Sequence, residues 1–125
     1  LIVLNIAAKP IAGSKGRGEI VERLATETFM PLTGGGGGRS TEDFRLLLEC
    51  GADKISINSA ALETPDLIGE AARIFGAQCV VVSIDVRRRP DGGLDVVDTR
   101  GTRFTGRDPI AWAKEAVERG AGEIL

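Results

Sequence analysis

Short apolar runs alternate with longer amphipathic segments along the whole chain. Four of these runs are continuously apolar rather than alternating between apolar and polar positions, which is typical of strands buried on both faces of a sheet. We predict strands over residues 1–8 (LIVLNIAA), 29–33 (FMPLT), 54–58 (KISIN) and 79–86 (CVVVSIDV), and the start of a fifth strand over residues 123–125.

Apolar residues spaced three or four positions apart predict a helix after each of the first four strands. We expect these helices to begin near Gly18, after a capping box that starts at Ser40, at Thr64 and Pro65 as N-cap and first residue, and at Asp108. Their inward faces are expected to contain Ile20, Val21, Leu24, Ala25, Phe44, Leu47, Leu48, Leu67, Ile68, Ala71, Ala72 and Phe75. Glycines are expected to end three of the helices, at Gly51, Gly76 and Gly120.

Strand and helix alternate four times, which predicts a parallel sheet with helical crossovers. The sequence CGADKI at 50–55 is echoed by RGAGEI at 119–124, which indicates repeated βα units. Residues 90–93 (PDGG) predict the turn of a β-hairpin inserted after the fourth strand. The predicted fold class is therefore α/β, with residues 1–125 forming one (βα)4 half-barrel of the (βα)8 type.

Both ends of the sequence fall inside or beside predicted strands, so we expect a segment of a larger barrel. Four βα units cannot close an eight-stranded barrel, and they would expose two sheet edges. A second copy of the chain, in a two-fold homodimer, would supply the missing strands. The alternative architecture is a flavodoxin-like open sheet that persists as a monomer.

Composition and charge exclude several classes of function. Hydrophobic residues make up 42% of the chain and charged residues 27%, as in an ordinary soluble globular protein. The net charge of −2 gives no reason to expect nucleic acid. No apolar run approaches the roughly 20 residues of a membrane helix.

Cysteine and histidine usage narrows the chemistry further. The absence of histidine removes Ser-His and Cys-His mechanisms and the usual zinc sites, and we expect neither a metal nor a cofactor. Cys50 and Cys79 are expected to be small buried thiols in a reducing cytoplasm.

Ligands of parallel βα folds bind at the carboxyl ends of the strands, where two groups of residues suggest an anion site. Five glycines, residues 34–38, follow the second strand, and their amides can approach a phosphate because no Cβ intervenes. A merely flexible loop would have the same composition, and five glycines exceed what a phosphate loop needs. Asn58 and Ser59 follow the third strand, either as a turn or as further phosphate ligands.

Charged residues at both ends of the predicted strands are the remaining candidates. Asp85 ends an apolar strand, where a carboxylate needs either an ion pair with Arg87 or Arg88 or a purpose such as general acid or base. The opposite ends of the strands carry charges that spacing alone assigns to a solvated rim or a stabilising pair: Asp53, Lys54 and Glu123.

Three longer stretches carry a family resemblance. GADKISINSAALETPDLI, VVVSIDVRR and TGRDPIAWAKEAVERGAGEIL resemble the cyclase subunit of imidazole glycerol phosphate synthase, from the family's second strand to the beginning of its sixth. The hairpin after Asp85 and the last helix favour this family over its sister barrel, the phosphoribosylformimino isomerase of the same pathway. The resemblance implies a cyclase of histidine biosynthesis. Such an enzyme uses ammonia to cyclise and cleave a phosphoribulosyl-formimino aminoimidazole carboxamide nucleotide. A partner glutaminase supplies the ammonia through the bottom of the barrel.

The resemblance also implies roles for individual residues. Asp85 matches the catalytic aspartate of the family's fifth strand, a general acid, and Gly37, Asn58 and Ser59 match positions that hold one substrate phosphate, with Gly36 beside them. At the bottom of the barrel, Lys54 and Glu123 match charged gate residues and Asp53 matches a residue at the glutaminase interface. Thr33 and Ser56 would line the ammonia route.

The chain departs from the family pattern in ways that affect catalysis. The family's first strand, with the second catalytic aspartate, and its seventh and eighth strands, with the second phosphate site, have no counterpart in the sequence. Asn5 stands where the family usually has Asp, and Gly34 and Gly38 replace branched apolar residues. Loss of one of two cooperating acid/base groups commonly costs about 10²–10⁴ in rate, so we expect little or no turnover from the chain alone. The competing hypothesis is an engineered or fragmentary barrel scaffold with no catalytic function.

Overall fold

The computed structural model describes residues 1–4, 15–98 and 103–125, with side chains described from Gly18 onward in the first helix. Five parallel strands form the main sheet, in the spatial order β1-β2-β3-β4-β7. Their bounds are β1 (Ile2–Leu4), β2 (Thr33–Gly35), β3 (Lys54–Ile57), β4 (Val80–Val82) and β7 (Glu123–Ile124). The α/β class and the parallel sheet predicted from the sequence are confirmed, and the architecture is that of a partial (βα)8 barrel.

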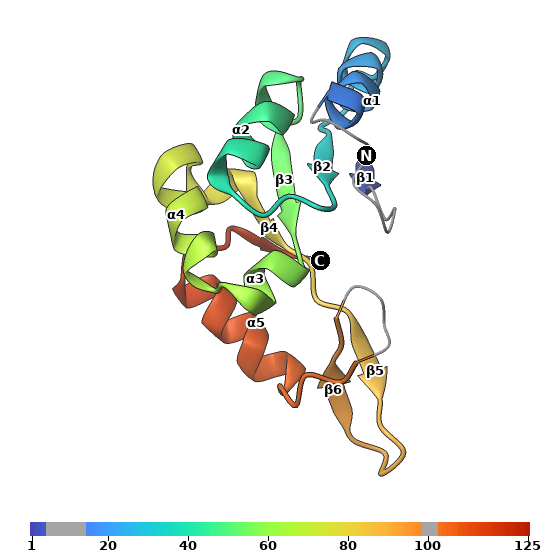
Figure 1. Ribbon diagram of the computed structural model, residues 1–125, viewed down its shortest axis with the longest axis vertical. Coiled ribbons are helices and arrows are strands. Elements are labelled where there is room, and N and C mark those ends of the chain that lie inside the picture. The colour runs from blue at the N-terminus through green and yellow to red at the C-terminus, as the bar shows by residue number, and fades with distance from the viewer. Residues whose placement is uncertain (5–14, 99–102) are drawn as a thin grey trace.

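The helices connect successive strands and lie on one side of the sheet (Figure 1). They are α1 (Lys15–Glu27), α2 (Thr41–Glu49), α3 (Ser59–Glu63), α4 (Asp66–Phe75) and α5 (Pro109–Glu118), with a 3-10 turn at Ala77–Cys79. In the described ranges, no helix is long and apolar enough to cross a membrane.

The hydrophobic core lies between the sheet and these helices. Ile55 and Ile57 of β3 and Val80 and Val82 of β4 point to this side, and all four are at most 1% exposed. They pack in one cluster with Phe44, Leu47, Ile68, Ala71, Trp112 and Ala116 from the helices. Since a fully buried aliphatic or aromatic side chain contributes about 1.5–3 kcal/mol, this single layer of contacts accounts for most of the stabilisation of such short strands.

Side-chain caps fix the starts of two helices as the sequence predicts. Ser40 accepts a hydrogen bond from the Asp43 amide, and the Asp43 carboxylate accepts one from the Ser40 amide, which completes the capping box of α2. Asp108 caps α5 by accepting from the Ala111 amide at 2.8 Å. At the other ends, Gly51, Gly76 and Gly120 follow α2, α4 and α5 with positive φ, as expected.

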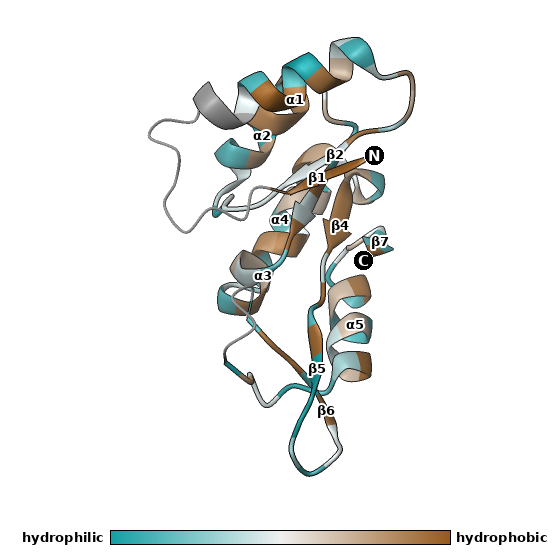
Figure 2. Cartoon of the chain, turned by 90° about the vertical axis from the view of Figure 1, so that its right-hand side faces the viewer, coloured by the Kyte–Doolittle hydropathy of each residue, from teal (hydrophilic) through white to brown (hydrophobic). Residues whose placement is uncertain are grey.

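The predicted β-hairpin is present and stands apart from the main sheet (Figure 1). Strands β5 (Val86–Arg88) and β6 (Leu94–Val96) pair with each other, antiparallel, around the turn at residues 90–93. The tip is hydrophilic, whereas β1 and β4 are hydrophobic (Figure 2). Arg107 joins the base of the hairpin to α5, because its guanidinium lies 4.6 Å from the Trp112 ring centroid and 3.3 Å from a Glu115 carboxylate oxygen.

The prediction of a strand over residues 29–33 is wrong in its position. Strand β2 begins only at Thr33 and includes Gly34 and Gly35, while Phe29 is fully exposed and Met30 is 57% exposed. Pro31 has no N–H to contribute to a ladder, and the pairing with β1 starts where the Thr33 amide donates to the Leu1 carbonyl.

Several smaller expectations also need correction. The helix expected at Thr64 begins with Pro65 as its N-cap and without a side-chain cap, because Thr64 already ends α3, a short helix that the sequence reading missed. The strand over 79–86 is limited to Val80–Val82, and Val86 belongs to the hairpin. Ile20 is exposed rather than buried. The predicted strand residues 5–8, including Asn5, lie outside the described residues.

Both cysteines are free thiols, and both are half-buried rather than buried as expected. Partial burial raises the pKa of the Cys50 thiol, and the nearby carboxylates of Glu22 and Glu49 raise it further. The thiol therefore stays neutral at physiological pH, as befits a packing residue.

The consecutive glycines have distinct packing environments. Leu4, Gly35 and Ser56 lie in one row across the sheet, on the face away from the helices. A Cβ on Gly35 would lie 2.8 Å from the Ser56 Cβ and 2.9 Å from a Leu4 methyl group. A Cβ on Gly34 would instead point toward the helices, at 3.5 to 3.7 Å from its neighbours, which is ordinary contact.

We therefore expect Gly35→Ala to destabilise the chain by about 1–3 kcal/mol, because the added methyl overlaps both a side chain and the Ser56 carbonyl oxygen. Gly34→Ala is the matched control, and it should be neutral or should stabilise by up to about 1 kcal/mol, since Gly weakens a strand relative to Ala. Urea unfolding of the three proteins measures the difference. Equal effects of the two substitutions would contradict the assignment of Gly35 to a close approach.

Candidate functional site

The carboxyl ends of β2, β3 and β4 meet at one edge of the sheet, and three of the predicted site segments lie within three residues of these ends. Because the strands are parallel and in register, the residues after Gly35, Ile57 and Val82 emerge at the same edge. These residues include Gly36 and Gly37 after β2, Asn58 and Ser59 after β3, and Asp85 after β4. We call them the carboxyl-edge cluster.

Asp85 and Asn58 are in direct contact within this cluster. The Asn58 side-chain amide donates to the Asp85 carboxylate, with 3.0 Å between Nδ2 and Oδ2. The backbone holds both residues in place: the Ser83 amide donates to the Ile57 carbonyl at 2.8 Å, and the Val97 amide donates to the Asp85 carbonyl at 2.9 Å. Asp85 is exposed, so its carboxylate is accessible to a ligand.

An ion pair of Asp85 with Arg88, one of its two expected arginine partners, is not formed. The Arg88 guanidinium donates to the Gly92 carbonyl at 2.7 Å, across the hairpin turn. Arg89 turns to Asp91 and to the buried Asp95 at 3.3 and 3.6 Å. Arg88 and Arg89 thus make contacts within the hairpin itself.

The glycines after β2 form a turn whose backbone angles other residues rarely adopt. Gly36 and Gly37 have φ of +94° and +70°, consecutive positive values that favour glycine. Successive amides in such turns can converge on an anion. Gly38 follows against the Phe44 ring, where a Cβ would lie 2.9 Å from a ring carbon.

Lys54 and Glu123 lie at the opposite, amino-terminal edge and form an ion pair there. The Lys54 ammonium donates to the Glu123 carboxylate across β4, which separates their strands. The side chains are 35% and 46% exposed. The structure thus places together the two charges that the sequence assigns to a rim or gate.

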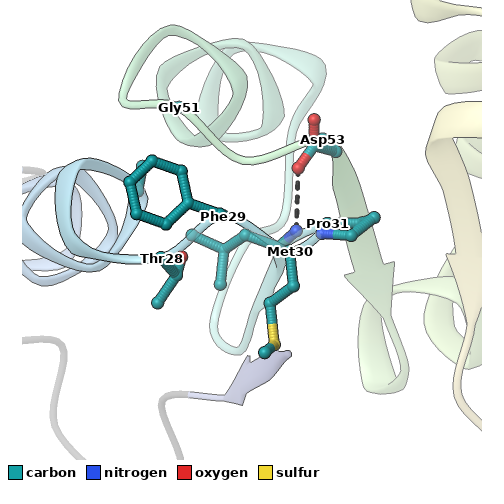
Figure 3. Close-up of a pocket in the computed structure, with 8 residues that line it drawn as sticks. Thr28, Phe29, Met30, Pro31, Gly51 and Asp53 are labelled. Atoms are coloured by element: carbon teal, nitrogen blue, oxygen red, sulfur yellow. Dashed lines mark hydrogen bonds between the residues drawn. The ribbon is translucent and has the colours of Figure 1, made fainter.

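Asp53 forms hydrogen bonds with the residue before β2 at the same edge. Its carboxylate accepts from the Leu32 amide at 2.7 Å, while its own amide donates to the Leu32 carbonyl at 2.8 Å. Beside this reciprocal pair lies a shallow pocket of about 370 Å³ (Figure 3). It is lined by Ala25, Thr28, Phe29, Met30, Pro31, Leu32, Gly51 and Asp53.

The sequence reading missed the exposed apolar residues of this pocket. Phe29 and Met30 were assigned to a buried strand, yet their side chains stand at the pocket wall (Figure 3). The signal that could have revealed them is Pro31, which makes a strand through this position unfavourable.

Thr33 and Ser56 lie between the two edges, and both side chains are buried, at 8% and 7% exposed. Ser56 shares the row of Leu4 and Gly35, away from the helices, and strand alternation puts Thr33 on the same face. In a closed barrel this face is the interior. Within residues 1–4, 15–98 and 103–125, no group of three or more Cys, Asp or Glu side chains is placed to hold a metal ion.

Comparison with known proteins points to one family. The family described as histidine biosynthesis protein matches residues 1–125. The chain is 54% identical over 107 residues to the imidazole glycerol phosphate synthase subunit HisF of Gluconacetobacter diazotrophicus, a match that covers 86% of this chain and 42% of the relative. It is 52% identical over 118 residues to the subunit of the same name from Caulobacter vibrioides, covering 91% of this chain and 45% of the relative. The chain thus spans less than half the length of these relatives.

We expect the Lys54–Glu123 pair to contribute little to stability, because exposed ion pairs are typically worth about 0–1 kcal/mol. Glu123→Gln should therefore lower the free energy of unfolding by less than about 1 kcal/mol in urea titrations. Ser40→Ala, which removes a side-chain cap that α2 uses, provides a reference loss of about 1 kcal/mol. A loss of several kcal/mol in Glu123→Gln would mean that the pair is structural.

Proposed function

The chain belongs to the histidine biosynthesis protein family, and we propose that it carries the phosphate-binding and acid-bearing part of an imidazole glycerol phosphate synthase cyclase. The observation that carries the proposal is the carboxyl-edge cluster, in which the Asp85 carboxylate, the Asn58 amide and the turn at Gly36 and Gly37 emerge from three neighbouring strands. The reaction is the ammonia-dependent cyclisation and cleavage of a phosphoribulosyl-formimino aminoimidazole carboxamide nucleotide.

One phosphate of this substrate is held at the turn after β2. Gly36 and Gly37 supply backbone amides to its oxygens, and Asn58 and Ser59 complete the site from β3. Binding at this point places the rest of the substrate along the same edge, toward the end of β4.

Asp85 is the general acid of the proposed site. It lies at the exposed end of β4 with its carboxylate oriented by Asn58. A carboxyl group held beside a bound phosphate can deliver a proton to the substrate when it is itself protonated. The second acid/base group of the family is expected on another strand, so the chain alone turns over slowly or not at all.

Ammonia arrives from the opposite edge of the sheet. The ion pair of Lys54 and Glu123 spans three strands there and forms part of a gate, and Thr33 and Ser56 provide buried hydroxyl groups along the interior face. Asp53, with the apolar pocket that Phe29 lines, faces the glutaminase partner. Exposed apolar surface at this edge supports a protein contact, since such patches commonly mark interfaces.

A second copy of the chain completes the barrel. Strands β1 and β7 form the edges of the described sheet, and Ile2, Leu4 and Leu125 are 42–46% exposed near them. Pairing of these edges in a two-fold homodimer would bury the apolar residues and satisfy the backbone groups. A scaffold of this shape without catalytic function is the competing proposal.

Phosphate binding tests the proposed site. We expect inorganic phosphate and glycerol phosphate to raise the melting temperature of the chain at millimolar concentration, because ligands that bind only the folded state stabilise it. Gly37→Ala should weaken this binding roughly tenfold, since an L-residue at φ +70° costs about 1–2 kcal/mol and the turn rearranges.

The matched control for this experiment is Gly92→Ala. Gly92 has φ of +88° and nothing within 4 Å of an added Cβ, so it carries the same backbone strain at the distant hairpin tip. Its phosphate affinity should equal that of the unmodified chain. No thermal shift with either ligand, or equal losses in both variants, would remove the phosphate site and favour the scaffold.

The homodimer predicts a mass near twice 13.2 kDa in solution. Light scattering on a size-exclusion column at several protein concentrations measures it. The burial of two open edges should keep the dimer intact at micromolar concentration. A concentration-independent monomer would instead support the open flavodoxin-like sheet.

A further inference from the structure

Asn58 occupies the N-cap position of α3 and yet does not cap it. Asparagine is among the best N-cap residues, because its side-chain oxygen accepts a hydrogen bond from an amide of the first helical turn. At Asn58 no side-chain cap hydrogen bond forms. Ser40 and Asp108, which cap α2 and α5 with their side chains, have extended backbones, whereas Asn58 has φ −127° and ψ −93°, outside the usual capping region.

The side-chain amide of Asn58 instead donates a hydrogen bond to Asp85. Its Nδ2 donates to the Asp85 Oδ2 at 3.0 Å, across the gap between the ends of β3 and β4. The orientation of the amide follows from charge, because the opposite orientation would set its oxygen against a carboxylate. Asp85 is thereby linked to a neighbouring strand as well as to the hairpin, whose Val97 amide donates to its carbonyl.

This arrangement leaves the amide oxygen of Asn58 without a partner. Its Oδ1 is buried and makes no hydrogen bond to the described residues. An unsatisfied buried acceptor is unfavourable, and most such groups in proteins are paired. The side chain nevertheless keeps the orientation in which its nitrogen reaches Asp85.

We propose that Asn58 is a positioning residue whose side-chain amide holds the Asp85 carboxylate in one orientation at the edge of the sheet. The unpaired buried oxygen of Asn58 is the local loss of stability that accompanies this contact. The value of that orientation for catalysis rests on the proposed function, since it assumes that Asp85 is the acid. The hydrogen bond is a property of the chain itself and can be tested without turnover.

The test compares Asn58→Ser with Asn58→Ala. Both side chains are too short to replace the amide that reaches Asp85, and serine keeps a polar hydroxyl that alanine lacks. Three-bond couplings from the Asp85 carboxyl carbon to its backbone nitrogen and carbonyl carbon, in ¹³C,¹⁵N-labelled protein, report the Asp85 χ1 rotamer. We expect one dominant rotamer in the unmodified chain and rotamer averaging in both variants.

Ser40→Ala is the control for a purely structural effect. It removes the α2 cap and should lower the melting temperature, while the Asp85 couplings stay unchanged. A single Asp85 rotamer in both Asn58 variants would overturn the positioning role.

The outcomes also separate this inference from the proposed function. If phosphate produces no thermal shift in the unmodified chain while the Asp85 rotamer depends on Asn58, the phosphate site fails and the positioning role stands. If phosphate binds and Asp85 keeps its rotamer without Asn58, the site stands and the positioning role fails.

Discussion

The parallel pairing of β3 with β2 on one side and β4 on the other is the constraint on which the rest of the structure depends. Each of these strands has only three or four residues, so none is stable alone. Ile55 and Ile57 bury the centre of the sheet under the helices, and the register of β3 fixes where its neighbours end. A slip of one residue would turn these isoleucines to the open face and separate Asn58 from Asp85.

The same register gives the sheet two edges with different residues. Asn58 and Asp85 lie where the strands end, and the Lys54–Glu123 pair and the Phe29 pocket lie where they begin. Thr33 and Ser56 connect the edges along the face that no described helix covers. The cyclase proposal requires chemistry at one edge and ammonia delivery at the other. Parallel strands provide this separation because all of them run in the same direction.

The sequence predicts the structure correctly where a few adjacent residues determine it. The Ser40 capping box, the Asp108 cap, the glycine helix ends and the hairpin turn all form as expected, because each depends on a few adjacent residues. Errors arose where tertiary contacts decide, as at Phe29 and Met30, which look like strand residues but are left exposed because the pairing with β1 begins at Thr33. The contact of Asn58 with Asp85 spans 27 positions, and no spacing rule foretells it. Roles beyond that contact stay predictions.

The hairpin of β5 and β6 has a consequence for how such a chain can be altered. Its strands pair with each other and not with the main sheet, and its tip at Gly92 has free space around it. The length of the hairpin is therefore uncoupled from the geometry of the sheet, while its base remains tied to Asp85 through the Val97 amide. The tip is therefore a suitable place to insert a reporter or a second binding module. A rigid insert there would be connected to the Asp85 carboxylate through one short hairpin.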